Sequence, residues 1–215
     1  MSLKTWQTRL KRRRAKLALN EKRVAWWKLE ITRAKKHIAD IKARRAAART
    51  LPTLMYDSIQ VSAIPTDARA VAGYTGGNWP TYPVLVKNFP KAKVVSIAVA
   101  SRYNAEILDV EPGDATPPLA VPWMERQLAG PRLNGRRPGV YCSVSTAQDV
   151  VNRLTRAGIP RTKYRLWTAH YTGVPHICTA ACGFGFHGVA DATQYTSKAL
   201  GRTLDASKCA PSFWT

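Results

Sequence analysis

Hydrophobic and polar positions follow two different periods along this chain, and the change falls near residue 50. Between residues 6 and 49 there is neither Gly nor Pro. Apolar residues recur every seven positions there, at Leu10, Leu17, Val24, Ile31 and Ile38. A second row runs through Trp27, Ala34, Ile41 and Ala48, interrupted upstream by Arg13 and Asn20. Alternating steps of three and four are typical of a coiled coil, so we predict one long helix that ends at about Arg49, ahead of Pro52.

From residue 51 onward, strand-like runs alternate with helix-like runs. Strands are expected near 54–61, 70–74, 94–100, 106–111, 138–142, 164–170 and 190–195. Helices are expected near 81–88, 118–129 and 145–157, the last beginning at a capping box of Thr146 and Asp149 and ending at Gly158. Strands that alternate with crossover helices imply a mostly parallel sheet. We predict an α/β protein, with a basic amphipathic helix over 1–50 and a compact, partly irregular β/α (TIM-like) barrel over 51–215.

Charge separates the same two segments. The net charge is +21; residues 1–50 hold 17 Lys and Arg against 3 Asp and Glu (+14), and residues 51–215 hold 17 against 10 (+7). The first segment therefore suits a polyanion such as nucleic acid, anionic lipid or an anionic wall polymer, and charge alone does not choose among them. No base-reading motif accompanies the charge, so sequence-specific nucleic-acid binding is not expected.

Three arrangements of the N-terminal helix stay open. It could pack on its own domain, or lie on an anionic surface with Trp6, Trp26 and Trp27 as interfacial anchors. It could also self-associate or pair with a partner helix. The residues expected at that contact are Leu10, Leu17, Val24, Trp27, Ile31, Ala34, Ile38 and Ile41.

Acidic residues are few after residue 50, and four fall where a barrel would gather them at one mouth. Asp57 lies on the first predicted strand, Asp109 and Glu111 end the fourth, and Asp205 follows a Gly-containing turn. In Asp-Val-Glu both carboxylates point to one face of a strand, and two like charges raise the proton affinity of one of them. Glycoside hydrolysis needs such a pair: a carboxylic acid that protonates the leaving oxygen, and a negative charge near the oxocarbenium-like centre.

Each carboxylate also has a structural interpretation. Asp57 could cap a turn near Ser58, and Asp205 could stabilise the turn at Gly201. Asp109 could form a salt bridge with Arg102 or Arg165. Asp114 and Asp191 are expected to be solvated loop residues.

Four motifs in order resemble the glycoside hydrolase family 25 lysozymes. Ile107–Pro112, with Asp109 and Glu111, resembles the D-x-E strand of that family. The segment from Leu166 to Tyr171 resembles its late Leu-Trp-x-Ala-x-Tyr strand, and residues 192–205 resemble its closing Gln-Tyr, Gly and Asp segment. Asp57 corresponds to the acid of the first strand, although Tyr56 stands where the family has Gly. The globular part is shorter than a full eight-fold barrel of roughly 200 residues or more, so several helices must be short or missing.

The resemblance implies roles for these residues. Glu111 would be the general acid, Asp109 would stabilise charge or assist the acetamido group of the substrate, and Asp57 and Asp205 would complete the site. Candidates for stacking on sugar rings are Trp79, Tyr103, Trp167, Tyr171 and Tyr195. Further candidates for substrate binding are Tyr74, His170 and Gln194, although His170 and His187 also fit hydrogen-bonded structural histidines.

Three functions follow from these features. The first is a muramidase that cleaves the β-1,4 bond between N-acetylmuramic acid and N-acetylglucosamine in peptidoglycan, of bacteriophage origin. With neither a secretory signal nor a membrane-spanning run in the sequence, it would be released from the host cytoplasm to the cell wall or ride in a virion. The second is a catalytically silent glycan-binding or structural virion protein that docks through its helix. The third, nucleic-acid binding, rests on residues 1–50 alone.

The cysteines add two further possibilities. Cys178 and Cys182 could close a small disulfide loop, or could bind zinc together with His170, His176 and His187. The C-x3-C pair lacks a second paired ligand set at zinc-finger spacing, so the sequence predicts no metal and no cofactor. Cys142 sits in an apolar strand and is expected to be a buried thiol.

Overall fold

The computed structural model of the chain describes residues 3–51 and 53–215, and the side chains of residues 3–43, 51 and 53–215. Pro52 and the side chain of Ala48, both part of the predictions above, lie outside the described residues. The chain divides into two units, Met1–Thr50 and Leu51–Thr215, and each is considered by itself. No helix in the described part of the chain is long and apolar enough to cross a membrane.

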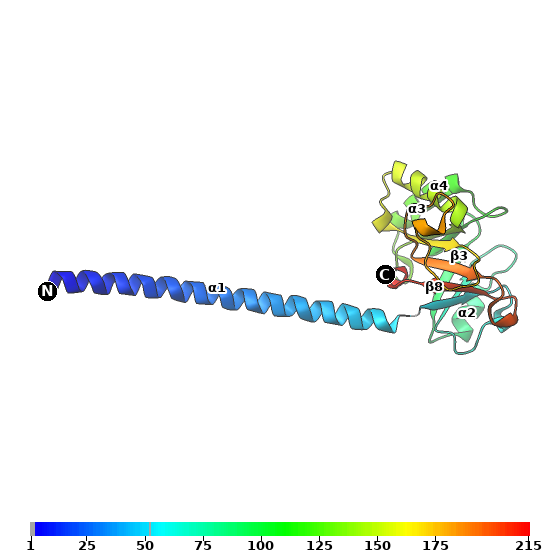
Figure 1. The fold of residues 1–215 in the computed structure, drawn as a ribbon. Helices are drawn as coiled ribbons and strands as arrows, with labels where there is room; N and C mark the ends of the chain where they lie inside the picture. The colour runs from blue at the N-terminus through cyan, green and yellow to red at the C-terminus, as the bar shows by residue number, and fades with distance from the viewer. Residues whose placement is uncertain (1–2, 52) are drawn as a thin grey trace. The chain divides into compact units, whose positions relative to one another are not determined.

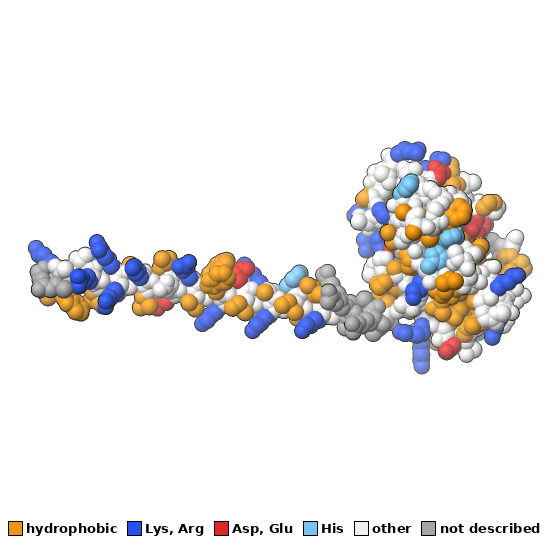
Figure 2. Space-filling model, in the orientation of Figure 1, with side chains coloured by type: hydrophobic (Ala, Val, Ile, Leu, Met, Phe, Trp, Pro, Cys, Tyr) orange, Lys and Arg blue, Asp and Glu red, His pale blue; other side chains and the backbone are white. Residues whose placement is uncertain are grey.

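The first unit is one helix, α1 (Leu3–Thr50), which ends one residue after the predicted position (Figure 1). Over residues 3–43 every side chain except the half-buried Glu30 is exposed. The predicted apolar rows therefore lie open, with 60% of Leu17 and 54% of Ile31 exposed. Figure 2 shows basic and apolar side chains along this helix with few acidic ones among them.

The second unit is a closed barrel of eight strands that follow one another around the barrel in chain order. Seven of them were predicted: β1 (Leu54–Asp57), β2 (Ala70–Tyr74), β3 (Lys93–Ala98), β4 (Ile107–Val110), β5 (Gly139–Ser143), β6 (Arg165–Ala169) and β7 (Ala192–Thr196). These seven run parallel. The eighth strand, β8 (Asp205–Cys209), was not predicted and runs antiparallel to both β7 and β1. Its sequence, Asp-Ala-Ser-Lys-Cys, holds no β-branched or aromatic residue, so local propensity gave no signal.

Three α-helices cover the described part of the barrel, as the short chain required. They are α2 (Tyr82–Asn88), α3 (Pro117–Ala129) and α4 (Val144–Arg156). In Figure 1, α3 and α4 lie together on one side of the barrel, and α2 packs against β2 and β3. The other connections contain only short 3-10 turns. The fold is thus an eight-stranded α/β barrel with incomplete helical cover and one reversed strand.

Helix α4 begins earlier than its predicted cap. The Ser143 hydroxyl accepts a hydrogen bond from the Ser145 amide at 3.2 Å, so Ser143 is the N-cap and Thr146 lies within the first turn. The end agrees with prediction: Gly158 has a φ of 76°, and the Ile159 amide donates to the Leu154 carbonyl. A left-handed residue of this kind favours Gly and stops the helix.

The barrel has an apolar interior and an apolar shell, which explains why its strands lack the alternation of half-exposed strands. Met55, Ile107 and Trp167 belong to the interior cluster. Leu108, Leu166 and their neighbours pack outward with α3 and α4. Cys142 is fully buried in that outer layer, as predicted.

The end of the barrel at which the parallel strands begin is held by buried ion pairs. Glu106, just before β4, contacts Arg136 at 2.6 Å and Arg165 at 3.1 Å. Arg165 is therefore the partner of Glu106 rather than of Asp109. Asp191, expected to be solvated, is instead buried; it pairs with Arg161 at 2.5 Å and accepts a hydrogen bond from the Leu166 amide.

Candidate active site

Four carboxylates converge at the opposite end of the barrel, where the parallel strands finish. Asp57 ends β1, Asp109 lies in β4, and Glu111 follows β4 directly. Asp205 opens β8, and because β8 is antiparallel, its first residue lies at the same mouth as the last residues of the other strands. Asp57 and Asp205 are register partners across the β1–β8 pair. The reversed strand is thus the reason that the fourth acid belongs to this group.

Asp57 and Asp205 form a hydrogen-bonded pair. Burial raises the pKa of Asp57 well above its ordinary value, and the charge of Asp205 and the hydrogen bond to it raise the pKa further. Burial also raises the pKa of Asp205, while its hydrogen bonds with Asp57 and Gln194 lower it. These opposite effects of the shared hydrogen bond favour the proton on Asp57 and the negative charge on Asp205.

Asp109 and Glu111 form a second acidic pair. Burial, then the charges of Glu111 and Asp114, raise the pKa of Asp109 to about 8. Glu111 is half-buried; burial and the charge of Asp114 raise its pKa, and a hydrogen bond from Tyr141 opposes that rise. Asp114 itself is exposed, as expected, but lies close enough to act on both acids.

These acids have no arginine or lysine partner of the kind that pairs with other buried acids in the described part of the barrel. The ion pairs among the described residues involve Glu30, Glu106, Asp149 and Asp191 instead. Asp57 Oδ2 and Asp109 Oδ1 are buried without a hydrogen-bond partner in the described part of the chain. Uncompensated burial favours the neutral carboxylic acid, which is the form that can donate a proton near neutral pH.

Tyrosine hydroxyls surround the acids. Tyr74, at the end of β2, has its pKa raised by burial and by the charges of Asp57 and Asp109, so its hydroxyl stays neutral. Tyr141 of β5 is the register partner of Asp109 and donates to Glu111. Tyr141 was not among the predicted site residues. Its strand was predicted, but strand register, which places it beside Asp109, has no local signal in sequence.

An open groove of about 580 Å³ adjoins the acids. Tyr74 and Asp114, which both interact electrostatically with the acidic group, line one part of it. Trp79, 58% exposed, and Arg102 also line it. The four carboxylates themselves are not lining residues. Trp79 therefore offers an exposed aromatic ring in this groove.

Tyr103 supports this groove from behind. A Cβ on Gly76, which lines the groove, would lie 2.9 Å from the Tyr103 ring, so the two are in close contact. The Arg102 guanidinium donates to the Tyr103 hydroxyl and covers its ring at 4.7 Å. Arg102 thus contacts Tyr103 rather than serving as the partner of Asp109.

The remaining predicted binding residues separate into two sets. Gln194 is buried beside Asp205 and donates to the hydroxyl of the exposed Tyr171 at 3.1 Å, so both lie at the mouth. Tyr195, the next residue of β7, lies near Tyr56, which packs with the cluster under α2, outside the mouth.

One prediction needs correction. Trp167 is 1% exposed; its indole donates to Ser207 inside the barrel, so it has no free face for a sugar ring. His170 fits the alternative of a hydrogen-bonded structural histidine, because it contacts His176 at 3.0 Å and Cys178 at 3.6 Å in the β6–β7 connection. That cluster, with Cys182, is the one group of four His and Cys side chains among the described residues that could hold a metal ion.

Comparison with known proteins supports the fold alone. No known family profile matches the chain, and no curated protein matches it. The crystal structure of an uncharacterized B. stearothermophilus protein is similar, with a TM-score of 0.52 and 16% sequence identity. The match covers 74% of this chain and 96% of that protein.

Proposed function

We propose that the barrel is a glycoside hydrolase of the family 25 lysozyme type, a TIM-like barrel that cleaves the β-1,4 bond between N-acetylmuramic acid and N-acetylglucosamine in peptidoglycan. The observation that carries this proposal is the convergence of four carboxylates at one barrel mouth with no ion pair to them among the described residues, with the pKa of Asp109 raised to about 8 and that of Glu111 raised. A phage lysin, released to the wall or carried in a virion, is the biological setting that we infer.

The proposed chemistry assigns one task to each pair of acids. Glu111, half-buried and next to the exposed Asp114, donates its proton to the glycosidic oxygen as the bond to the anomeric carbon breaks. The negative charge of the Asp57–Asp205 pair stabilises the positive charge that develops on the sugar. Water adds to the anomeric carbon and returns a proton to a carboxylate, which restores the site.

Both acids of the second pair have raised pKa values. Asp109, with its pKa raised to about 8, can donate a hydrogen bond to the substrate's acetamido oxygen, while burial and the charge of Asp114 favour the protonated form of Glu111. The groove beside Trp79 would then receive the neighbouring sugars, with ring stacking on the exposed indole.

The test compares Glu111→Gln with the parent chain on purified peptidoglycan. We expect the parent to release new reducing ends and to clear a wall suspension, and Glu111→Gln to lose on the order of 10²-fold or more in rate because it has no proton to donate. Glu125→Gln is the matched control, since Glu125 is an exposed acid on α3. No cleavage by folded parent protein, or equal rates for parent and Glu111→Gln, would refute the proposal.

The two exposed apolar rows of α1, called the seam below, favour a second candidate. It is a glycan-binding or structural protein that docks through its helix. A helix with regularly spaced, exposed apolar side chains is stabilised by burying them against another helix. On this proposal residues 1–50 join a second copy or a partner helix, and their basic side chains bind an anionic wall polymer. Peptidoglycan binding by the parent chain without release of reducing ends would favour this candidate over the enzyme.

The helical contact has its own test. Light scattering at several protein concentrations should give a mass above that of one chain for the parent, and a lower mass for the double variant Ile31→Asp, Ile38→Asp. Leu29→Asp is the control, because Leu29 is also exposed but lies off the seam. A single-chain mass for the parent at all concentrations would exclude self-association and leave a different partner helix.

A further inference from the structure

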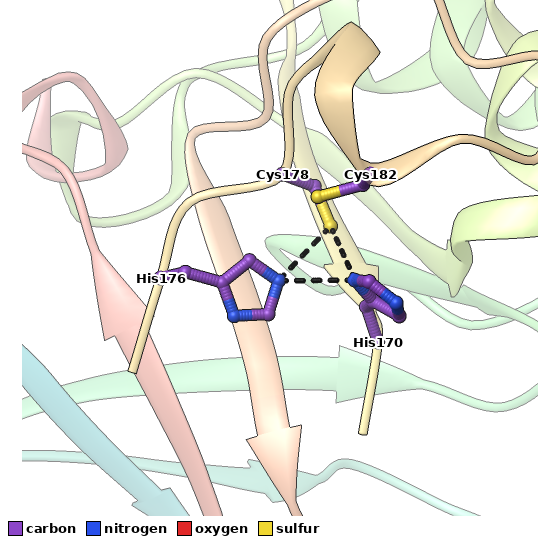
Figure 3. A group of neighbouring side chains, drawn as sticks. All are labelled: His170, His176, Cys178 and Cys182. Carbon is purple, nitrogen blue, oxygen red and sulfur yellow. Dashed lines mark hydrogen bonds between the residues drawn. The ribbon is translucent and has the colours of Figure 1, made fainter. Parts of the chain in front are cut away.

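Four metal-ligating side chains meet in the connection between β6 and β7. They are His170, His176, Cys178 and Cys182, and their ligand atoms all lie within 4.8 Å of one another. Figure 3 shows both imidazole rings facing the Cys178 sulfur, with the Cys182 sulfur next to it. All four cysteines of the chain are free thiols in this structure.

The spacing of three of these ligand atoms is close to that of a tetrahedral zinc site. The Cys178 Sγ lies 3.6 Å from His170 Nδ1 and 3.6 Å from His176 Nε2. Bonds of about 2.3 Å from zinc to sulfur and about 2.0–2.1 Å to nitrogen, at tetrahedral angles, separate sulfur and nitrogen by about 3.6 Å. The two ring nitrogens are 3.0 Å apart, so a small outward movement of one ring would bring these three atoms to tetrahedral spacing, with the Cys182 sulfur within 4.8 Å of each.

Hydrogen bonds outside the cluster orient its ligands. His176 Nδ1 lies 2.8 Å from the Val174 carbonyl, which can only accept, so Nδ1 carries the proton and the Nε2 lone pair faces the cluster. The Cys178 amide donates to Thr193 Oγ1 at 2.8 Å, which anchors that ligand to β7. Zinc-bound histidines usually donate their second ring N–H in this way, because the bond fixes both tautomer and ring direction.

Local hydrogen bonds and one glycine stabilise the turn that places Cys182 near the other ligands. Thr179 caps the short 3-10 turn Ala180–Cys182, its hydroxyl accepting from the Ala181 amide. Gly183, with a φ of 79°, reverses the chain immediately afterwards, a conformation that favours Gly. The Cys178 and Cys182 thiols therefore lie on the same side of one tight loop.

We propose that His170 Nδ1, His176 Nε2, Cys178 Sγ and Cys182 Sγ bind one zinc ion. Two imidazoles and two thiolates form a closed four-ligand set of the kind that selects zinc and leaves no position for substrate. The ion's role is structural, and it is independent of the function proposed above. It fixes the β6–β7 connection, in which Tyr171, next to His170, accepts the hydrogen bond of Gln194 at the barrel mouth.

The test measures metal content on the full chain, expressed with zinc and purified under reducing conditions. Native mass spectrometry should show one zinc ion per chain, retained by His187→Ala, an exposed histidine outside the cluster, and lost by His176→Ala and by Cys182→Ser. Folded parent protein without bound zinc would overturn the proposal. A mass two hydrogens lower, with Cys178 joined to Cys182, would overturn it in favour of a disulfide.

A second measurement tests the proposal on the parent chain alone, so its result does not depend on whether these variants fold. Cobalt(II) added to the zinc-depleted parent chain should produce intense visible bands of a tetrahedral ion and a sulfur-to-metal charge-transfer band. Stoichiometric zinc should then abolish both. A weak octahedral cobalt spectrum without the charge-transfer band would contradict the assignment, whatever the variants do.

Discussion

Asp109→Asn should stabilise the barrel at neutral pH while it removes an acid from the proposed active site. The Asp109 side chain is 3% exposed, and its pKa is raised from an ordinary value of 3.8 to about 8. A carboxyl group with a raised folded-state pKa contributes stability that is fully present below its unfolded pKa and is lost as the pH rises through its folded pKa. The parent therefore loses stability between these two values, and an Asn side chain, which does not ionise, does not.

The size of the effect follows from the shift. Each unit of pKa difference is worth about 1.4 kcal/mol, so the advantage of Asn should grow to about 4 kcal/mol at pH 7 relative to strongly acidic solution. Because Asp109 Oδ1 has no hydrogen-bond partner among the described residues, replacing the carboxylic acid by the amide should disturb few contacts.

Urea denaturation at several pH values between about 4 and 8 measures this difference directly. The free energy of unfolding of Asp109→Asn minus that of the parent should rise steadily with pH. Asp149→Asn, a half-buried acid paired with Arg153 on α4, is the matched control outside the acidic group. A difference that is independent of pH, or a variant less stable than the parent at pH 7, would refute the reasoning.

Further predictions concern other parts of the barrel. Glu106→Ala leaves two buried Arg side chains without their partner and should cost about 3–5 kcal/mol in urea denaturation, whereas Glu125→Ala should change stability by less than about 0.5 kcal/mol. Gly139→Ala places a Cβ 2.9 Å from the Arg165 carbonyl oxygen, in a backbone that cannot easily move, and should cost about 1–3 kcal/mol in the same assay. If the barrel is a glycosidase, kcat should fall as the pH rises through the raised pKa of Glu111, and a rate that increases steadily with pH would contradict the role of that residue.

The sequence predicted the barrel well where strands are apolar, and failed where a strand is polar. Seven runs of apolar residues marked seven strands, because in a barrel with both faces covered nearly every strand position is buried. β8 has Ser207 and Lys208 in its middle and was missed. Its direction, which brings Asp205 to the mouth, depends on pairing with β1 and β7 and cannot be obtained from the segment alone.

The site residues divide in the same way. Acids at the ends of predicted parallel strands could be grouped in advance, because topology sends those ends to one mouth. Trp167 was assigned to substrate from a motif, although the motif does not say which face of the strand a side chain occupies. The four-ligand cluster was passed over because a second paired set at zinc-finger spacing was sought, whereas all its members lie in one loop between residues 170 and 182.

Buried acids are paired with arginines at one end of the barrel and surrounded by other acids at the other end. This contrast is the strongest physical argument for a functional site at the second end. Where the strands begin, Glu106 and Asp191 are buried, and each is paired with arginines. Where they finish, Asp57 and Asp109 are equally buried, and their neighbours are other acids. The same chain can therefore neutralise a buried carboxylate and does not do so at the mouth. Unpaired buried acids lower stability at neutral pH, and here they occur on several strands at one end of the barrel. Such an arrangement is expected at a functional site, where a protonated acid and a nearby negative charge are needed.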